Sequence, residues 1–134
     1  MFTKALITGF AIAIASTAAT QVTAGTTCKD VHIEAHNETG KQVKVIDMYY
    51  KTYDARGRVV ETGNEVIKNS EVPKGKSYTT TRNLEDANGL STRVWIEYRV
   101  RKKHSGWDQW TGVQSASSDR VNCERYASFE VELD

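Results

Sequence analysis

The sequence predicts a small all-β domain: an antiparallel β-sandwich of immunoglobulin-like type, with seven to eight strands and one disulfide bond. Three observations support this fold class. Apolar residues recur at every second position over most of the chain, which is the period of a half-buried strand. Glycine, asparagine and aspartate separate these segments at short intervals, as in hairpin turns. Two cysteines lie near opposite ends of the alternating region.

The first two predicted strands show alternation that is interrupted once. Apolar side chains alternate over 31–35, and the polar segment 37–40 ends this strand. A second strand runs over 43–50, but its apolar phase moves by one residue at Val45 and Ile46. Because a one-residue slip would turn every later side chain to the other face, it predicts a β-bulge or a strand that passes between layers.

The middle strands are shorter and are bounded by turns. Segment 54–57 has the composition of a tight hairpin turn and ends in Gly57. Apolar pairs on either side of Gly63 indicate one interrupted strand or two short ones. The threonine-rich segment 77–82 has a single large side chain, which is typical of an edge strand.

Segment 94–100 has the cleanest alternation in the chain and predicts a central strand. A turn at 104–106 leads into a strand within 107–113, and a last strand keeps one parity of apolar residues up to Leu133. The side chains expected on the polar side of the central strand are Arg93, Trp95, Glu97, Arg99 and Arg101.

The two cysteines indicate how the first and last strands run. An even pair in an exported chain is expected to form a bridge. Cys28 comes just before the first predicted strand, and Cys123 comes just before or early in the last. Joining two strand starts requires the strands to run roughly parallel. Up-and-down barrels pair their first and last strands antiparallel, so the bridge favours an immunoglobulin-like sandwich.

Residues 1–24 are predicted to be a signal peptide, which leaves one domain over 25–134. A positive charge at Lys4 precedes an apolar stretch of small residues, and Val22 and Ala24 form the expected cleavage signal before Gly25. The apolar stretch is shorter than the roughly 20 residues that span a bilayer. We therefore expect a secreted or periplasmic protein that is not an integral membrane protein.

The charge balance argues against a general attraction to polyanions. The chain has 18 lysine and arginine residues and 17 aspartate and glutamate residues, and removal of Lys4 leaves 17 of each. A neutral domain has no global field that would draw it to nucleic acid, so nucleic acid is not an expected partner. Binding to anionic glycans or lipids requires a local patch.

The segment His32, Glu34 and His36 resembles a metal-binding pattern. Alternate residues of a strand point to one face about 7 Å apart, so neighbours in this set can share an ion. The two histidines are about 13 Å apart, which is too far for one ion on a flat strand. With at most two ligands and no obvious third, a solvated strand face is favoured, and no metal or other cofactor is predicted.

The strongest candidate binding site is a basic hairpin with tryptophans. Cations attract anionic partners over long distances, and tryptophan supplies apolar area and a stacking face. Because positions 107 and 110 differ in parity, both cannot face outward on a regular strand. A second aromatic group, Tyr49 and Tyr53, is expected on one strand face, as a ligand surface or as cross-strand packing. The candidate binding residues are Arg99, Arg101, Lys102, Lys103, Trp107 and Trp110.

These observations predict a non-enzymatic binding domain that acts on another protein outside the cytoplasm, as an inhibitor, immunity or accessory factor. The alternative is a module that binds anionic glycan or membrane surfaces through the basic hairpin. A small hydrolase or metal-dependent enzyme is less favoured, because no nucleophile elbow is present and both cysteines are expected to be oxidised. No catalytic residue is predicted.

Substitution of Cys28 by serine should lower the melting temperature without directly altering the binding surface. A bridge that closes a loop of about 95 residues contributes roughly 4 kcal/mol by restricting the unfolded chain. Thermal unfolding of the variant and of the reduced wild type checks this. A variant of unchanged stability that has lost function would instead give the cysteines a chemical role.

Overall fold

Two β-sheets face one another in the computed structural model, which describes residues 28–87, 89–104 and 107–134, without the side chains of 103–108. The predicted signal peptide lies outside the described residues. Nothing in the described part is a helix long and apolar enough to cross a membrane. The strands are β1 (Val31–Asn37), β2 (Val43–Tyr53), β3 (Val59–Glu65), β4 (Ser70–Val72), β5 (Ser77–Arg82), β6 (Ser91–His104), β7 (Trp107–Trp110), β8 (Gln114–Ser117), β9 (Val121–Asn122) and β10 (Ser128–Leu133).

The small sheet has the order β10-β1-β5, with β1 parallel to β10 and antiparallel to β5. Cys28 and Cys123 are joined by a disulfide, are fully buried and have Cα atoms 4.8 Å apart. The bridge therefore fastens the entry to β1 beside the chain that leads into β10. The predicted disulfide and the predicted parallel relation of the first and last strands are both confirmed. The threonine-rich strand β5 lies at an edge, as expected.

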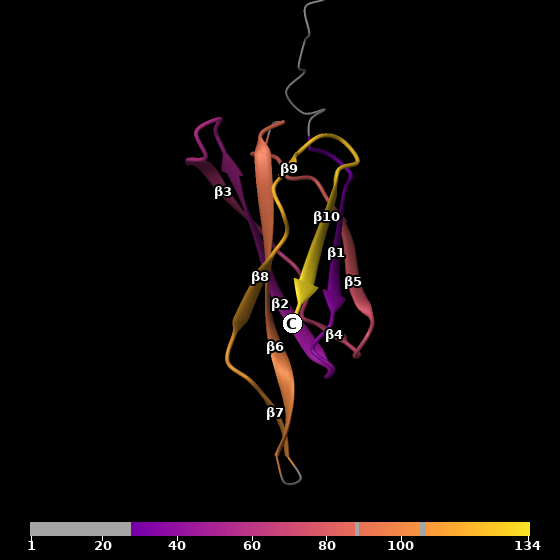
Figure 1. Ribbon diagram of the computed structural model, residues 1–134. Coiled ribbons are helices and arrows are strands. Elements are labelled where there is room, and N and C mark those ends of the chain that lie inside the picture. The colour runs from indigo at the N-terminus through magenta and orange to yellow at the C-terminus, as the bar shows by residue number, and fades with distance from the viewer. Residues whose placement is uncertain (1–27, 88, 105–106) are drawn as a thin grey trace, which may run out of the picture.

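The large sheet is built around β2 and β6, which pair antiparallel over most of their length. β3 and β4 pair with β2, whereas β7, β8 and β9 pair with β6. Figure 1 shows the two sheets as separate layers and the paired ends of β6 and β7 extending beyond the small sheet. The described residues form ten strands rather than seven to eight, because strands such as β4 and β9, of three and two residues, are too short to leave an alternation in the sequence.

The predicted irregularity in β2 is a β-bulge. The register of β2 against β6 shifts between Val45 and Asp47, which leaves Ile46 without a partner. Val45 and Met48 are consequently both buried, although they are three positions apart. The bulge keeps both halves of this long strand packed against the core.

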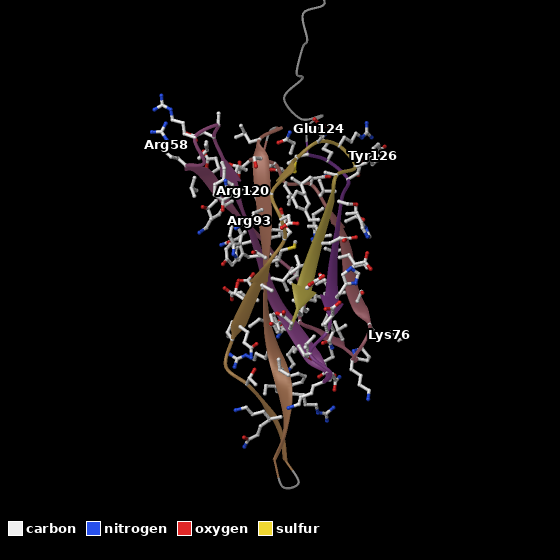
Figure 2. All side chains as sticks on the ribbon, viewed as in Figure 1. Arg58, Lys76, Arg93, Arg120, Glu124 and Tyr126 are labelled. Atoms are coloured by element: carbon white, nitrogen blue, oxygen red, sulfur yellow. A yellow bond between two sulfur atoms is a disulfide. The ribbon has the colours of Figure 1, made fainter. Side chains whose placement is uncertain are left out.

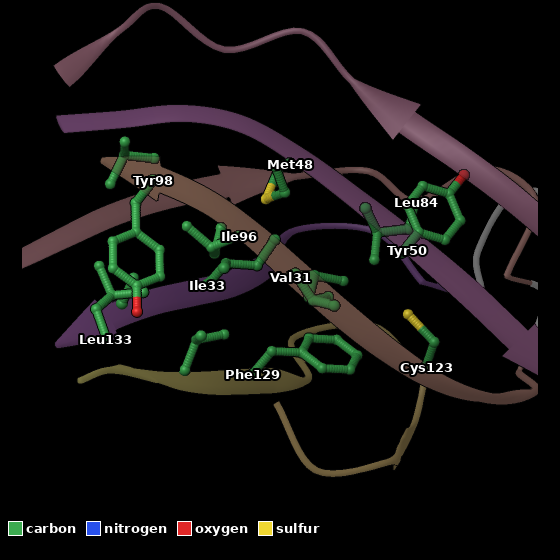
Figure 3. Close-up of a cluster of buried hydrophobic side chains, with 14 of the residues drawn as sticks. Val31, Ile33, Met48, Tyr50, Leu84, Ile96, Tyr98, Cys123, Phe129 and Leu133 are labelled. Atoms are coloured by element: carbon green, nitrogen blue, oxygen red, sulfur yellow. The ribbon is translucent and has the colours of Figure 1, made fainter. Parts of the chain in front are cut away.

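The core fills the space between the two sheets (Figure 3). Ile33 and Phe129 reach it from the small sheet, and Ile96 and Tyr98 reach it from the large sheet, all at most 2% exposed. The Tyr98 hydroxyl donates a hydrogen bond of 2.8 Å to the backbone oxygen of Asp134, which ties the end of β10 to β6. Burial of the ring raises the pKa of Tyr98 above its ordinary value.

Gly63 gives β3 room to pass beside Tyr50. A Cβ atom at Gly63 would lie 2.2 Å from the Tyr50 ring, far inside van der Waals contact. The two residues are register partners on β2 and β3, so the ring covers the glycine directly. The Tyr50 hydroxyl in turn accepts a hydrogen bond from the Asp86 amide at 3.4 Å. Gly63 was expected to interrupt a strand, but it lies inside the continuous strand β3. Its lack of a side chain allows the Tyr50 ring to approach the backbone closely.

Substitution of Gly63 by alanine should destabilise the fold by about 1–3 kcal/mol, because the Tyr50 ring must move or β3 must shift. Gly112→Ala is the matched control, since a Cβ there meets nothing within 4 Å. Urea unfolding of both variants measures the difference. Equal stability of the two variants would show that the close approach is not constrained.

Candidate functional site

The outer face of the large sheet carries a connected set of aromatic and basic side chains, here called the cationic-aromatic face. It is built from alternate positions of β2 and β6, whose other positions supply the core. Each of these side chains is partly buried against its neighbours. The face consists of Lys44, Tyr49 and Lys51 from β2, Arg93, Trp95 and Arg99 from β6, and Trp110 from β7.

An aromatic stack lies at the centre of this face. Tyr49 and Trp95 are register partners on β2 and β6, and their rings are 5.4 Å apart at an interplanar angle of 4°. This separation is within the range of favourable aromatic pairs. The stack forms a flat apolar platform on the outside of the sheet.

Basic side chains lie over these rings. The Lys51 ammonium is 5.2 Å from the Trp95 ring centre, and the Arg93 guanidinium is 5.8 Å from it. The Lys44 ammonium is 4.4 Å from the Trp110 ring. Within the described part of the chain, none of these three cations forms a salt bridge with a carboxylate, and Nε of Arg93 is buried without a hydrogen-bond partner. These three cations are therefore held over aromatic rings and form no direct ion pair with any described residue.

An acidic pair divides the cations of the face into two groups. Asp47 and Glu97 are register partners between the Tyr49–Trp95 stack and Lys44. Toward the disulfide end lie Lys51 and Arg93, together with Arg120 of the segment between β8 and β9 (Figure 2). Toward the β6–β7 ribbon lie Lys44, Arg99 and Arg101. A ligand that covers the face would meet positive charge at both ends.

Tyr53 occupies a different environment from Tyr49. The register of β2 against β3 shifts between Thr52 and Tyr53, and the Arg120 guanidinium lies 3.7 Å from the centre of the Tyr53 ring. Only 7% of Tyr53 is exposed. Of the two alternatives for Tyr49 and Tyr53, packing applies to Tyr53, because the Arg120 guanidinium covers its ring.

The hairpin residues predicted as the binding site lie in different environments: some contact other parts of the chain, and Lys102 is exposed. Arg99 donates a hydrogen bond of 3.2 Å to the backbone oxygen of Thr111, and Arg101 donates to the Gln42 side chain. Trp110 lies under Lys44, so the base of the hairpin is tied to β2. Lys102 is exposed, whereas the side chains of Lys103 and Trp107 lie outside the described ones. In the strand register Trp107 is opposite His104 and Trp110 is opposite Arg101, positions of opposite parity.

The outer face of the small sheet has the opposite character. His32, Glu34 and His36 point outward from β1, beside Glu130 and Glu132 of β10. Glu34 lies between the two histidines. Its Oε2 atom is 3.6 Å from Nε2 of His32, and its Oε1 atom is 3.7 Å from Nδ1 of His36. Nδ1 of His36 is also 2.8 Å from the Ser77 hydroxyl on β5. Carboxylates and histidines therefore lie together on this face, whereas basic side chains outnumber the Asp47–Glu97 pair on the outer face of the large sheet.

A groove of about 460 Å³ adjoins this acidic face where the edge strands β8 and β10 approach each other. Its wall on the β8 side contains two serines and an alanine, and its wall on the β10 side contains carboxylates. The lining residues are Ser115, Ala116, Ser117, Asp119, Glu130, Glu132 and Asp134. Glu130 belongs both to the groove and to the outer face of the small sheet.

Two features could not be predicted from the sequence: the stacking of Tyr49 on Trp95, and the position of Glu130 opposite Glu34. Alternation placed Tyr49 and Trp95 on outer faces correctly, but only the strand register shows that they are opposite each other. Glu130 alternates with the apolar residues of the last strand and therefore faces outward, and the parallel register places it opposite Glu34. The predicted parallel relation of β1 and β10 was the signal that could have suggested this neighbour.

A comparison with protein-family models, characterised proteins and solved structures finds no match to this chain.

Replacing Tyr49 and Trp95 by alanine, singly and together, should reveal a direct interaction between the rings. Stacked aromatic pairs contribute about 0.5–1.5 kcal/mol beyond their buried area, so the double variant should lose less stability than the sum of the single variants by that amount. Urea unfolding of all four proteins measures the coupling. Strict additivity would contradict a stabilising stack.

Proposed function

We propose that this chain is an exported, non-enzymatic binding domain that recognises another protein outside the cytoplasm through its cationic-aromatic face. The single observation that supports the proposal is the set of cations that lie over the Tyr49–Trp95 platform without a direct ion pair among the described residues. Tryptophan, tyrosine and arginine are the usual anchors of protein interfaces, because they bury large areas and keep polar contacts. The disulfide is compatible with an extracellular or periplasmic location.

The partner surface is proposed to be acidic at two places and apolar between them. Lys51 and Arg93 at one end of the face and Lys44 at the other attract carboxylates, and the stack between them offers apolar contact. Such charge complementarity raises the association rate and sets the orientation of the partner. The rigid strands β2 and β6 hold the anchors in place, so little side-chain order has to be gained on binding.

Charge reversal on the face tests this function. The double variant Lys51→Glu with Arg93→Glu should no longer retain, from the exported fraction of the native host, a protein that wild type captures in stoichiometric amount. With the purified captured protein, we expect binding of the variant to be at least ten-fold weaker by calorimetry. The matched control is Lys74→Glu with Lys76→Glu, an equal charge change at exposed positions leading into β5.

Two results would contradict the proposal. Equal binding by the face variant and the control would place the interface elsewhere. Binding of heparin or of anionic vesicles that weakens steeply with salt and is lost in Lys102→Glu with Lys103→Glu, without capture of any protein, would favour the alternative function of the hairpin. Salt dependence alone does not distinguish the two, so both variants are measured in each assay.

A further inference from the structure

Three potential metal ligands from two strands meet on the outer face of the small sheet. One donor atom from each of Glu34, His36 and Glu130 lies within 4.8 Å of the other two. Ligands at the zinc distances of about 2.0–2.2 Å are about 3.4 Å apart in a tetrahedral site. Small rotations of these partly exposed side chains are therefore enough to bring all three donors to one ion.

The strand pairing supplies the third ligand. Glu34 and His36 are alternate residues of β1 and share its outer face, which accounts for two donors. The parallel register sets Glu34 opposite Glu130, so the neighbouring strand contributes the third. Because β1 is the middle strand of its sheet, both of its ligands are held by backbone pairing on either side.

A second group orients the histidine. Nδ1 of His36 is 2.8 Å from the Ser77 hydroxyl of β5. The same nitrogen is 3.7 Å from a carboxylate oxygen of Glu34, so contacts from two strands set the orientation of the His36 ring beside the carboxylates.

From this geometry we propose that Glu34, His36 and Glu130 form a site for a zinc-type divalent cation. Two carboxylates balance the charge of the ion, and the imidazole nitrogen favours Zn²⁺ over Ca²⁺ or Mg²⁺, which prefer oxygen donors alone. Three protein ligands leave a fourth position for water or for a group of a bound partner. Glu130 also lines the groove between β8 and β10, so this position borders a space that a partner can enter. The site is independent of the cationic-aromatic face.

Calorimetric titration of the oxidised chain with Zn²⁺ tests the site. We expect one equivalent to bind and to raise the melting temperature, since a ligand that binds only the folded state stabilises it. His36→Ala and Glu130→Gln should each weaken binding at least ten-fold, whereas His32→Ala, the same change on the same strand face, should alter it less than three-fold. Circular dichroism of each variant verifies that these surface changes leave the fold intact.

Titrations with other metal ions test the proposed class of ion, and the variants also define the results that would overturn the site. Ca²⁺ and Mg²⁺ should not compete with Zn²⁺ at equal concentration, and Co²⁺ should bind with a visible absorption band that His36→Ala removes. Less than one equivalent of Zn²⁺, unchanged affinity in His36→Ala, or a loss in His32→Ala alone would each overturn the proposal. Effective competition by Ca²⁺ would overturn the proposed class of ion.

Discussion

The parallel pairing of β1 with β10, fastened by the buried Cys28–Cys123 bridge, is the constraint on which the rest of the structure depends. The bridge joins two positions that are 95 residues apart in sequence, and the pairing sets β10 beside β1 in the small sheet. Loop closure over such a length is costly for an unlinked chain, and the bridge reduces that cost by restricting the unfolded state. The same pairing brings Glu130 of β10 beside Glu34 of β1, so a stabilising feature also builds a cluster of potential ligands.

The strands of the large sheet show how a regular alternation serves two purposes. On β6, Val94 and Ile96 fill the core, and between them Trp95 points outward to stack on Tyr49. On β2, the bulge at Ile46 restores the phase so that Met48 remains buried and Tyr49 reaches the outer face. If Ile46 took a regular place in the ladder instead, Met48 would face outward and Tyr49 would face the core. The cationic-aromatic face thus depends on a backbone irregularity several residues away.

Much of the fold could be predicted from the sequence because its determinants are local or covalent. Period-two alternation identified the core side of β1 and β6, a single phase slip located the bulge, and the positions of Cys28 and Cys123 indicated parallel end strands. The candidate sites were less accessible, because they arise from cross-strand register. Alternation says that Trp95 and Glu130 face outward, but it does not say which residues of other strands lie beside them. The cover that Arg120 provides for Tyr53 depends on a contact between distant segments and had no signal in the sequence.

The two outer faces offer separate chemistry on one scaffold: cations over aromatic rings on one, and carboxylates with histidines on the other. Each face follows from the register of its strands. The parallel register of β1 and β10 determines both the closure of the small sheet by β10 and the cluster of potential metal ligands. Diffraction from crystals grown with Zn²⁺, recorded at the zinc absorption edge, tests it most directly. We expect one anomalous peak at bonding distance from Glu34, His36 and Glu130 together, with β10 parallel to β1. A peak held by β1 residues without Glu130, or an antiparallel β10, would contradict it.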